Sequence, residues 1–179
     1  YLRMVNYRKF KRVDFELHPA LNVFLGNNGS GKTSILDAIS LLISSIFPRC
    51  EYQPRIRALS YELRNIRSYM KCVRGKFRPM HEDVSGIVGT LSHYEHADDF
   101  EKYKAVGLSV GRKLSTQQEL CIDSTIDELA SRYNERVKKG DSIPTFAHYG
   151  SHRGAEQGDR KRFNRRKIDS TNPFAAYIN

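Results

Sequence analysis

The sequence has 179 residues, 39% of them apolar and 11% aromatic, which excludes an intrinsically disordered chain and gives one domain enough material for its own core. Its longest apolar run, around ISLLISSIF, is interrupted by serines and is much shorter than the about 20 residues that a membrane-spanning helix needs. Thirty Lys and Arg against twenty Asp and Glu give a net charge of +10, which favours nucleotide phosphates, nucleic acid or an acidic protein surface as partners.

The three cysteines and the two ends of the chain indicate its redox environment and its relation to a longer protein. Cys50, Cys72 and Cys121 have neither CxxC nor metal-binding spacing, so we expect reduced thiols in a cytoplasmic protein. The chain begins at Tyr1 instead of Met and stops without an obvious closing element. We therefore expect residues 1–179 to be a single N-terminal lobe of a longer protein. The rest of that protein is then an alternative partner for the basic surface of this lobe.

The first predicted elements, within residues 1–47, are a β-hairpin and a third strand. YLRMVNY and KRVDFELHP alternate as strands do and flank a basic turn around RKFK. LNVFL, residues 21–25, is a short apolar run typical of a buried strand. A hairpin directly before a strand and a glycine loop indicates an antiparallel layer added beside them.

A phosphate-binding loop is predicted at residues 26–33, GNNGSGKT, which fits the pattern G-x-x-x-x-G-K-[ST]. Glycines let successive backbone N–H groups point at a phosphate, and the following helix adds its positive N-terminal end. Lys32 is expected to contact the β- and γ-phosphates, and the Thr33 hydroxyl to coordinate magnesium. The expected nucleotide contacts are Gly26, Asn27, Asn28, Gly29, Ser30, Gly31, Lys32, Thr33 and Ser34. The alternative is a glycine-rich turn before an ordinary helix.

The segment TSILDAISLLISSIF that follows the loop has helical apolar spacing and is brought to an end by Pro48. Its apolar residues occupy more than one side, so the helix is expected to lie buried beneath a sheet. Asp37 interrupts them and is expected to be solvated or locally paired, with no catalytic role.

Residues 48–82 are rich in Arg, Lys, Tyr and Ser and allow two interpretations. One is a basic and aromatic face for nucleic acid. The other, which we favour, is a surface helix followed by a loop, because Leu59, Leu63, Ile66 and Met70 lie at near-helical spacing.

The remaining elements alternate between strand and helix patterns. We expect a β-hairpin over 84–112, an amphipathic helix over 123–139 ended by Gly140, and a buried strand over 143–149. A basic loop follows over 151–167 and is a candidate for nucleic-acid backbone, with an acidic protein or plain solvent as alternatives. Its candidate residues are Arg160, Lys161, Arg162, Arg165, Arg166 and Lys167.

The run from Asn6 to Leu42 resembles the N-terminal lobe of SMC/RecF/OLD-type ABC ATPases. Asn6, Tyr7 and Phe10 match that family's N-F-x-x-[FH] element, with Tyr in place of Phe. The loop and helix element of the family is matched by Asn28, Leu36, Ala38 and Ile39.

A weaker resemblance lies in IPTFAHYGSHR, residues 143–153. It is similar to a segment of bacterial AAA-type ATPases from virulence and phage-defence systems of the Septu and retron-associated type. Tyr149 and Arg153 match that segment, while His148 replaces a Tyr.

The resemblance implies an α/β fold: a P-loop NTPase with an ABC-ATPase-like N-terminal lobe and an antiparallel β layer beside the P-loop strand and helix. It implies ATP and magnesium as cofactors, a homodimer or larger oligomer, and coupling to DNA, RNA or an effector nuclease in repair or anti-phage defence. It also implies that a basic residue such as Arg8 reaches the phosphates, with a solvated turn cation as the alternative.

The resemblance further implies an LSGGQ-like signature and an Asp-Glu pair after four apolar residues. KLSTQQELCIDSTIDE, residues 113–128, has pieces of both but the wrong spacing, and we expect ordinary structure there. No catalytic residue is identified in this chain, and hydrolysis is expected only after dimerisation or completion by a C-terminal half. The alternatives are a P-loop small-molecule kinase and a nucleic-acid-binding module with a vestigial P-loop.

Overall fold

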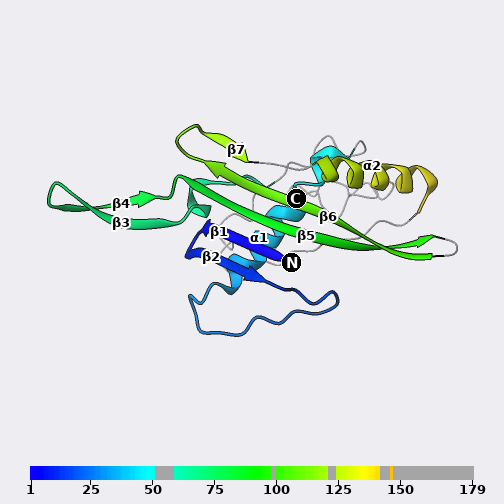
Figure 1. Ribbon diagram of the computed structural model, residues 1–179, viewed down its shortest axis with the longest axis horizontal. Coiled ribbons are helices and arrows are strands. Elements are labelled where there is room, and N and C mark those ends of the chain that lie inside the picture. Colours follow the sequence, from blue (N-terminus) through cyan, green and yellow to red (C-terminus); the bar gives the residue numbers. More distant parts are fainter. Residues whose placement is uncertain (51–58, 98–99, 121–123, 142–145, 147–179) are drawn as a thin grey trace, which may run out of the picture.

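A computed structural model describes residues 1–50, 59–97, 100–120, 124–141 and 146. Figure 1 shows a long antiparallel sheet with two helices packed against it and a second, smaller hairpin projecting from one end. In chain order the elements are β1 Leu2–Tyr7, β2 Phe10–Phe15, α1 Lys32–Ser44, η1 Phe47–Arg49, η2 Leu63–Asn65, β3 Ser68–Val73, β4 Lys76–His81, β5 Val84–Ala97, β6 Phe100–Lys113, β7 Gln118–Leu120 and α2 Ser124–Lys139.

The main sheet has five strands in the order β2-β1-β5-β6-β7, and every neighbouring pair is antiparallel. The antiparallel layer expected from the sequence is therefore present, and its first hairpin pairs Leu2 with Phe15 and Tyr7 with Phe10. Alternation along β1 buries Leu2 and Met4. Asn6, at φ 49, then breaks the alternation, so that Tyr7 is buried as well.

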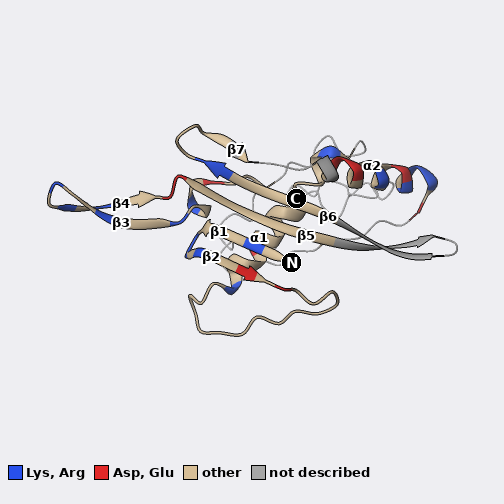
Figure 2. Ribbon diagram, in the orientation of Figure 1, with Lys and Arg blue, Asp and Glu red and all other residues tan. Residues whose placement is uncertain are grey.

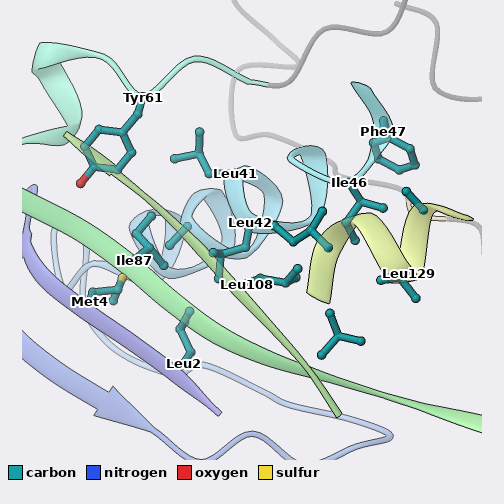
Figure 3. Close-up of a cluster of buried hydrophobic side chains, with 14 of the residues drawn as sticks. Leu2, Met4, Leu41, Leu42, Ile46, Phe47, Tyr61, Ile87, Leu108 and Leu129 are labelled. Carbon is teal, nitrogen blue, oxygen red and sulfur yellow. The ribbon is translucent and has the colours of Figure 1, made fainter. Parts of the chain in front are cut away.

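The core lies between this sheet and the two helices. Figure 3 shows Leu41, Leu42 and Ile46 from the first helical segment meeting Leu2, Met4, Ile87 and Leu108 from the strands, with Leu129 of α2 nearby. The expectation that the first helix packs beneath a sheet is confirmed. Its outer side is not buried, because Leu36 keeps 43% of its surface exposed. None of the described helices is both long and apolar enough to cross a membrane.

The first helix ends before the proline that was expected to terminate it. It stops at Ser44, and Pro48 lies within the short 3-10 turn η1. The hydroxyls of Ser44 and Ser45 donate to the carbonyls of Leu41 and Leu42, three residues back. These side-chain bonds compete with continued α-helical pairing and mark its end.

The prediction of a strand over LNVFL is wrong for this structure. Residues 16–31 contain no strand, and Leu21, Val23 and Leu25 expose 73%, 69% and 89% of their surface. A strand needs a neighbour to take up its backbone hydrogen bonds, and the five-stranded sheet offers this segment none. The expected β layer beside the loop therefore consists of β1 and β2 without a P-loop strand.

The favoured helix within 48–82 is also wrong over the described residues 59–82. Leu59 and Leu63 are half exposed, whereas Tyr61 and Ile66 are buried. Only a single 3-10 turn, η2, precedes two paired strands, β3 and β4. The near-helical spacing of the four apolar residues was accidental, and the Arg-Gly turn at residues 74–75 decides the local structure.

The later elements lie where the sequence predicts a hairpin and a helix. β5 and β6 pair from Val84–Lys113 to Ala97–Phe100. α2 ends at Lys139 and is followed by Gly140 with φ 77. The N–H groups of Gly140 and Asp141 donate to Val137 and Arg136, a Schellman motif. LSTQQ begins the turn from β6 to β7 instead of a signature helix. The strand predicted over 143–149, apart from Phe146, and the basic loop over 151–167 lie outside the described residues.

Candidate nucleotide-binding site

The candidate site is the turn between β2 and α1, where three glycines adopt left-handed backbone angles. Gly26, Gly29 and Gly31 have φ values of 154, 77 and 105. Gly31 has no room for a side chain, because a Cβ there would lie 2.5 Å from Cζ of Phe10. Two features thus require glycine at position 31: its backbone angle and the aromatic ring packed against it.

The N-terminus of α1 has the properties of an anion site. Gly31 caps the helix without a side-chain hydrogen bond, and the first turn contains no acidic residue. The first helical bond runs from the N–H of Ile35 to the carbonyl of Gly31 at 3.0 Å. The preceding N–H groups of Lys32, Thr33 and Ser34 therefore point out of the helix end, where its dipole is positive.

Lys32 folds back over the loop. Its Nζ donates to the carbonyl oxygens of Gly26 at 2.6 Å and Asn27 at 2.9 Å, and lies 3.4 Å from Oγ of Ser30. The N–H of Ser30 also donates to the carbonyl of Asn27, which closes the turn. Because these partners are neutral oxygens, they leave the charge of the ammonium available to an anion that enters the loop.

The turn of the first hairpin lies directly against the loop. Lys9 donates its Nζ to the carbonyl of Gly29 at 2.6 Å, and the Phe10 ring packs on Gly31. Lys9 was not among the residues predicted for the site, although it adjoins Arg8 in the same basic turn. The approach of this turn to residues 29–31 is a tertiary contact between segments about 20 positions apart, which spacing along the sequence does not record.

Arg8 reaches the helix that follows the loop. Its Nη1 lies 2.6 Å from Oδ2 of Asp37, both side chains are about a quarter exposed, and Arg8 also stacks on the Tyr7 ring at 5.4 Å. Of the two alternatives expected for Asp37, solvated or locally paired, the structure shows the paired one. Arg8 thus lies at the border of the site with an acidic partner, in a left-handed conformation with φ 49.

The other predicted contacts lie on the exposed side of the loop. Asn27, Asn28 and Thr33 are exposed, while Ser30 and Ser34 are partly buried. The described part of the chain holds no group of three or more His, Cys, Asp or Glu that could bind a metal ion. The site therefore provides anion-binding groups, and a hydroxyl at Thr33, but no cluster of carboxylates.

The predicted nucleic-acid residues cannot be placed against this site. Arg160, Lys161, Arg162, Arg165, Arg166 and Lys167 all lie outside the described residues. The same holds for the 147–153 part of the segment that resembles defence-system ATPases.

Comparison with known families gives a match over nearly the whole chain. The family model described as an AAA domain, AAA_23, matches residues 1–172.

Individual relatives match over shorter stretches. The chain is 30% identical over 83 residues to the DNA replication and repair protein RecF of Alkaliphilus oremlandii, a match that covers 46% of this chain and 21% of that protein. It is 51% identical over 41 residues to RecF of Colwellia psychrerythraea, which covers 23% of this chain and 11% of the relative, and 46% identical over 39 residues to RecF of Clostridium tetani. The chain thus spans about a fifth or less of the length of these RecF proteins.

Proposed function

Because the chain belongs to the AAA domain family, we propose that its glycine-rich loop binds ATP with magnesium as the N-terminal lobe of a RecF- or SMC-like ATPase. The observation that carries this proposal is the convergence of two ammonium groups on one loop. Lys32 donates to residues 26 and 27 and Lys9 to residue 29, beside an uncapped helix N-terminus. A triphosphate supplies the negative charge that this arrangement lacks.

The residues present fit the cofactors that the family implies. The backbone of residues 26–31 and the Lys32 ammonium would hold the phosphates, and the Thr33 hydroxyl would ligate magnesium. Bound magnesium would neutralise charge on the phosphate oxygens. Arg8 is part of the proposal as a further phosphate contact, since it borders the loop.

We propose further that ATP is hydrolysed only when another protein segment or a second copy completes the site. Asp37, the acidic residue of α1, is engaged with Arg8 and is therefore not free to serve as general base. The relatives are named as DNA replication and repair proteins, so we propose coupling of the ATPase cycle to DNA in the cytoplasm.

The test is a titration with a fluorescent ATP analogue and magnesium, comparing the wild-type protein with Lys32→Ala. Lys11→Ala serves as the matched control, because Lys11 is an exposed cation on β2, outside the loop. We expect Lys32→Ala to weaken binding tenfold or more, about 1.4 kcal/mol, and Lys11→Ala to bind as wild type. Equal affinity of the Lys32 variant and the wild type would overturn the proposal.

The rate of ATP hydrolysis separately tests whether another segment or a second copy must complete the active site. Residues 1–179 alone are expected to bind ATP without sustained turnover, whereas a longer protein that includes the completing segment is expected to hydrolyse it. Sustained turnover by residues 1–179 at protein concentrations where they are monomeric would show that a complete active site lies within them.

A further inference from the structure

The β3–β4 hairpin is a separate arm of the molecule. It forms its own two-stranded sheet and projects from the end of the main sheet (Figure 1). Every residue from 68 to 81 is exposed except Val73 and His81, which are partly buried. Such an arm contributes little to the hydrophobic core, so its side chains are available for another purpose.

The turn of this arm fixes which side chains share a face. Arg74 and Gly75 have φ values of 51 and 74, the two positive angles of a type I′ turn between Val73 and Lys76. The register then places Lys71 opposite Arg78, Tyr69 opposite Met80 and Cys72 opposite Phe77. Because directly opposed residues point to the same side of a sheet, the arm has two different faces.

One face is basic and the other is apolar. The basic face carries Tyr69, Lys71, Val73, Lys76, Arg78 and Met80, and the apolar face carries Met70, Cys72, Phe77 and Pro79 beside Ser68 and His81. Arg74 lies at the tip, where it lines a hollow together with Val73, Lys76 and Arg78.

The charge of the arm is uncompensated. Residues 68–81 contain no Asp or Glu, and β3 and β4 show blue but no red in Figure 2. The nearest acidic residues in the sequence, Glu82 and Asp83, lie between β4 and β5 at the base of the arm. Both are engaged there: Glu82 pairs with Arg67 at 3.1 Å, and Asp83 accepts from Ser115. Among the described residues, no acidic side chain pairs with any of the arm's four cations, Lys71, Arg74, Lys76 and Arg78.

The direct opposition of Lys71 and Arg78 is unfavourable in the free protein. Like charges opposed across two strands destabilise a hairpin, and on an exposed two-stranded ribbon little other packing offsets the loss. A polyanion lying across the basic face turns the same pair into a favourable contact. The spacing of cations along the ribbon therefore suits an extended chain of phosphates better than a single small anion.

We propose that the β3–β4 arm binds the phosphate backbone of nucleic acid through Lys71, Arg74, Lys76 and Arg78. Tyr69, on the same face, offers a ring on which an unpaired base stacks. A two-stranded ribbon also fits the major groove of duplex DNA. This inference names the contact surface for the proposed coupling to DNA and rests on that proposal only for the identity of the polyanion.

The test is the salt dependence of binding to a fluorescent duplex oligonucleotide, measured by anisotropy between about 50 and 200 mM KCl in the intact protein. Lys71→Gln/Arg78→Gln removes the opposed pair. Because each phosphate contact contributes about −0.9 to the slope of log K against log salt, we expect the slope to become shallower by about 2 and the affinity at 100 mM salt to fall tenfold or more. The same comparison with a single-stranded probe tests the role of Tyr69 through Tyr69→Ala.

The matched control is Arg136→Gln/Lys139→Gln, which removes the same charge from exposed positions at the end of α2. We expect it to keep the wild-type slope. An unchanged slope in the arm variant, or an equal change in both double variants, would overturn the proposal; the first result would direct attention to the apolar face as a protein contact.

Failure of this inference is distinguishable from failure of the proposed function. The arm variant is expected to bind the ATP analogue as wild type does and to melt at or slightly above the wild-type temperature, since the two side chains are exposed and their repulsion is removed. Unchanged nucleic-acid binding together with Lys32-dependent ATP binding rejects the arm alone. If ATP binding does not depend on Lys32 but the salt slope does depend on the arm, the ATP site is rejected and the proposal for the arm stands.

Discussion

The guanidinium of Arg8 and the carboxylate of Asp37 lie 2.6 Å apart, so that an ion pair joins the turn of the first hairpin to the first helix beside the phosphate loop. The two residues are 29 positions apart in the sequence, and the contact exists because Lys9 and Phe10 hold the same turn against residues 29 and 31. The hairpin is therefore part of the candidate site, and its cations can be tested in pairs with their partners.

Arg8→Ala and Asp37→Asn separate a phosphate contact from a structural ion pair. Both variants break the Arg8–Asp37 pair, but only the first removes the cation. We expect Arg8→Ala to weaken binding of the ATP analogue about tenfold and Asp37→Asn to leave it equal or tighter, because a freed guanidinium is drawn to phosphate. Equal weakening in both variants, in the same titration, would show that Arg8 acts only by positioning the hairpin.

Gly31→Ala is expected to damage the site more than Gly29→Ala. Both glycines have positive φ, which costs an L-residue about 1–2 kcal/mol, but a Cβ at position 29 meets nothing within 4 Å, whereas one at position 31 meets the Phe10 ring. We expect Gly31→Ala to lower the free energy of unfolding in urea by a further 1–3 kcal/mol or so, and to abolish measurable ATP binding. Equal losses of unfolding free energy in the two variants would mean that the Phe10 ring moves aside without a loss of stability.

Tyr7→Phe is expected to be tolerated at neutral pH. The Tyr7 side chain is fully buried, and its hydroxyl finds no hydrogen-bond partner among the described residues. Its removal therefore costs nothing, and about 1 kcal/mol of stability is expected to be gained. A loss of more than about 1 kcal/mol at pH 7 in urea unfolding would reveal a partner for this hydroxyl.

The same substitution has a signature at alkaline pH. Burial raises the pKa of Tyr7 from 10.0 to about 12, so the unfolded chain loses this proton before the folded protein does. Stability contributed by the neutral phenol is complete below about pH 10 and is lost as pH rises toward 12. The free energy of unfolding of Tyr7→Phe should fall less steeply than that of the wild type between about pH 10 and 12. Parallel curves would assign the alkaline transition to another group, such as Tyr61, whose pKa burial also raises.

Gly111→Ala and Gly86→Ala are matched changes on opposite sides of one ladder position in the main sheet. A Cβ at Gly111 would lie 2.6 Å from the carbonyl oxygen of Ser85, which is backbone and held by pairing, whereas one at Gly86 comes no closer than 3.4 Å to any atom. We expect Gly111→Ala to cost about 1–3 kcal/mol of folding free energy and Gly86→Ala clearly less. Thermal melts of the two purified variants provide the comparison, which fails if their midpoints coincide.

The sequence by itself determined the elements whose cause is local. The alternation of YLRMVNY and KRVDFELHP around a basic turn gave the first hairpin, and the apolar spacing after Thr33 gave the helix and its buried side. The loop pattern GNNGSGKT likewise located the three left-handed glycines, because positive φ is a preference of the residue itself. The matching family model, over residues 1–172, agrees with the resemblance read from these same residues.

Only the tertiary structure decided the features that depend on a neighbour. LNVFL has the composition of a strand, but a strand exists only where another strand accepts its hydrogen bonds, and the described residues offer none. The sequence favoured a surface helix followed by a loop within residues 48–82, whereas residues 68–81 form a hairpin, because cross-strand pairing around Arg74 and Gly75 makes them an arm with a basic face. The approach of Lys9 to the phosphate loop also depends on a neighbour, because it comes from packing of the hairpin turn on residues 29 and 31, which spacing along the chain does not record.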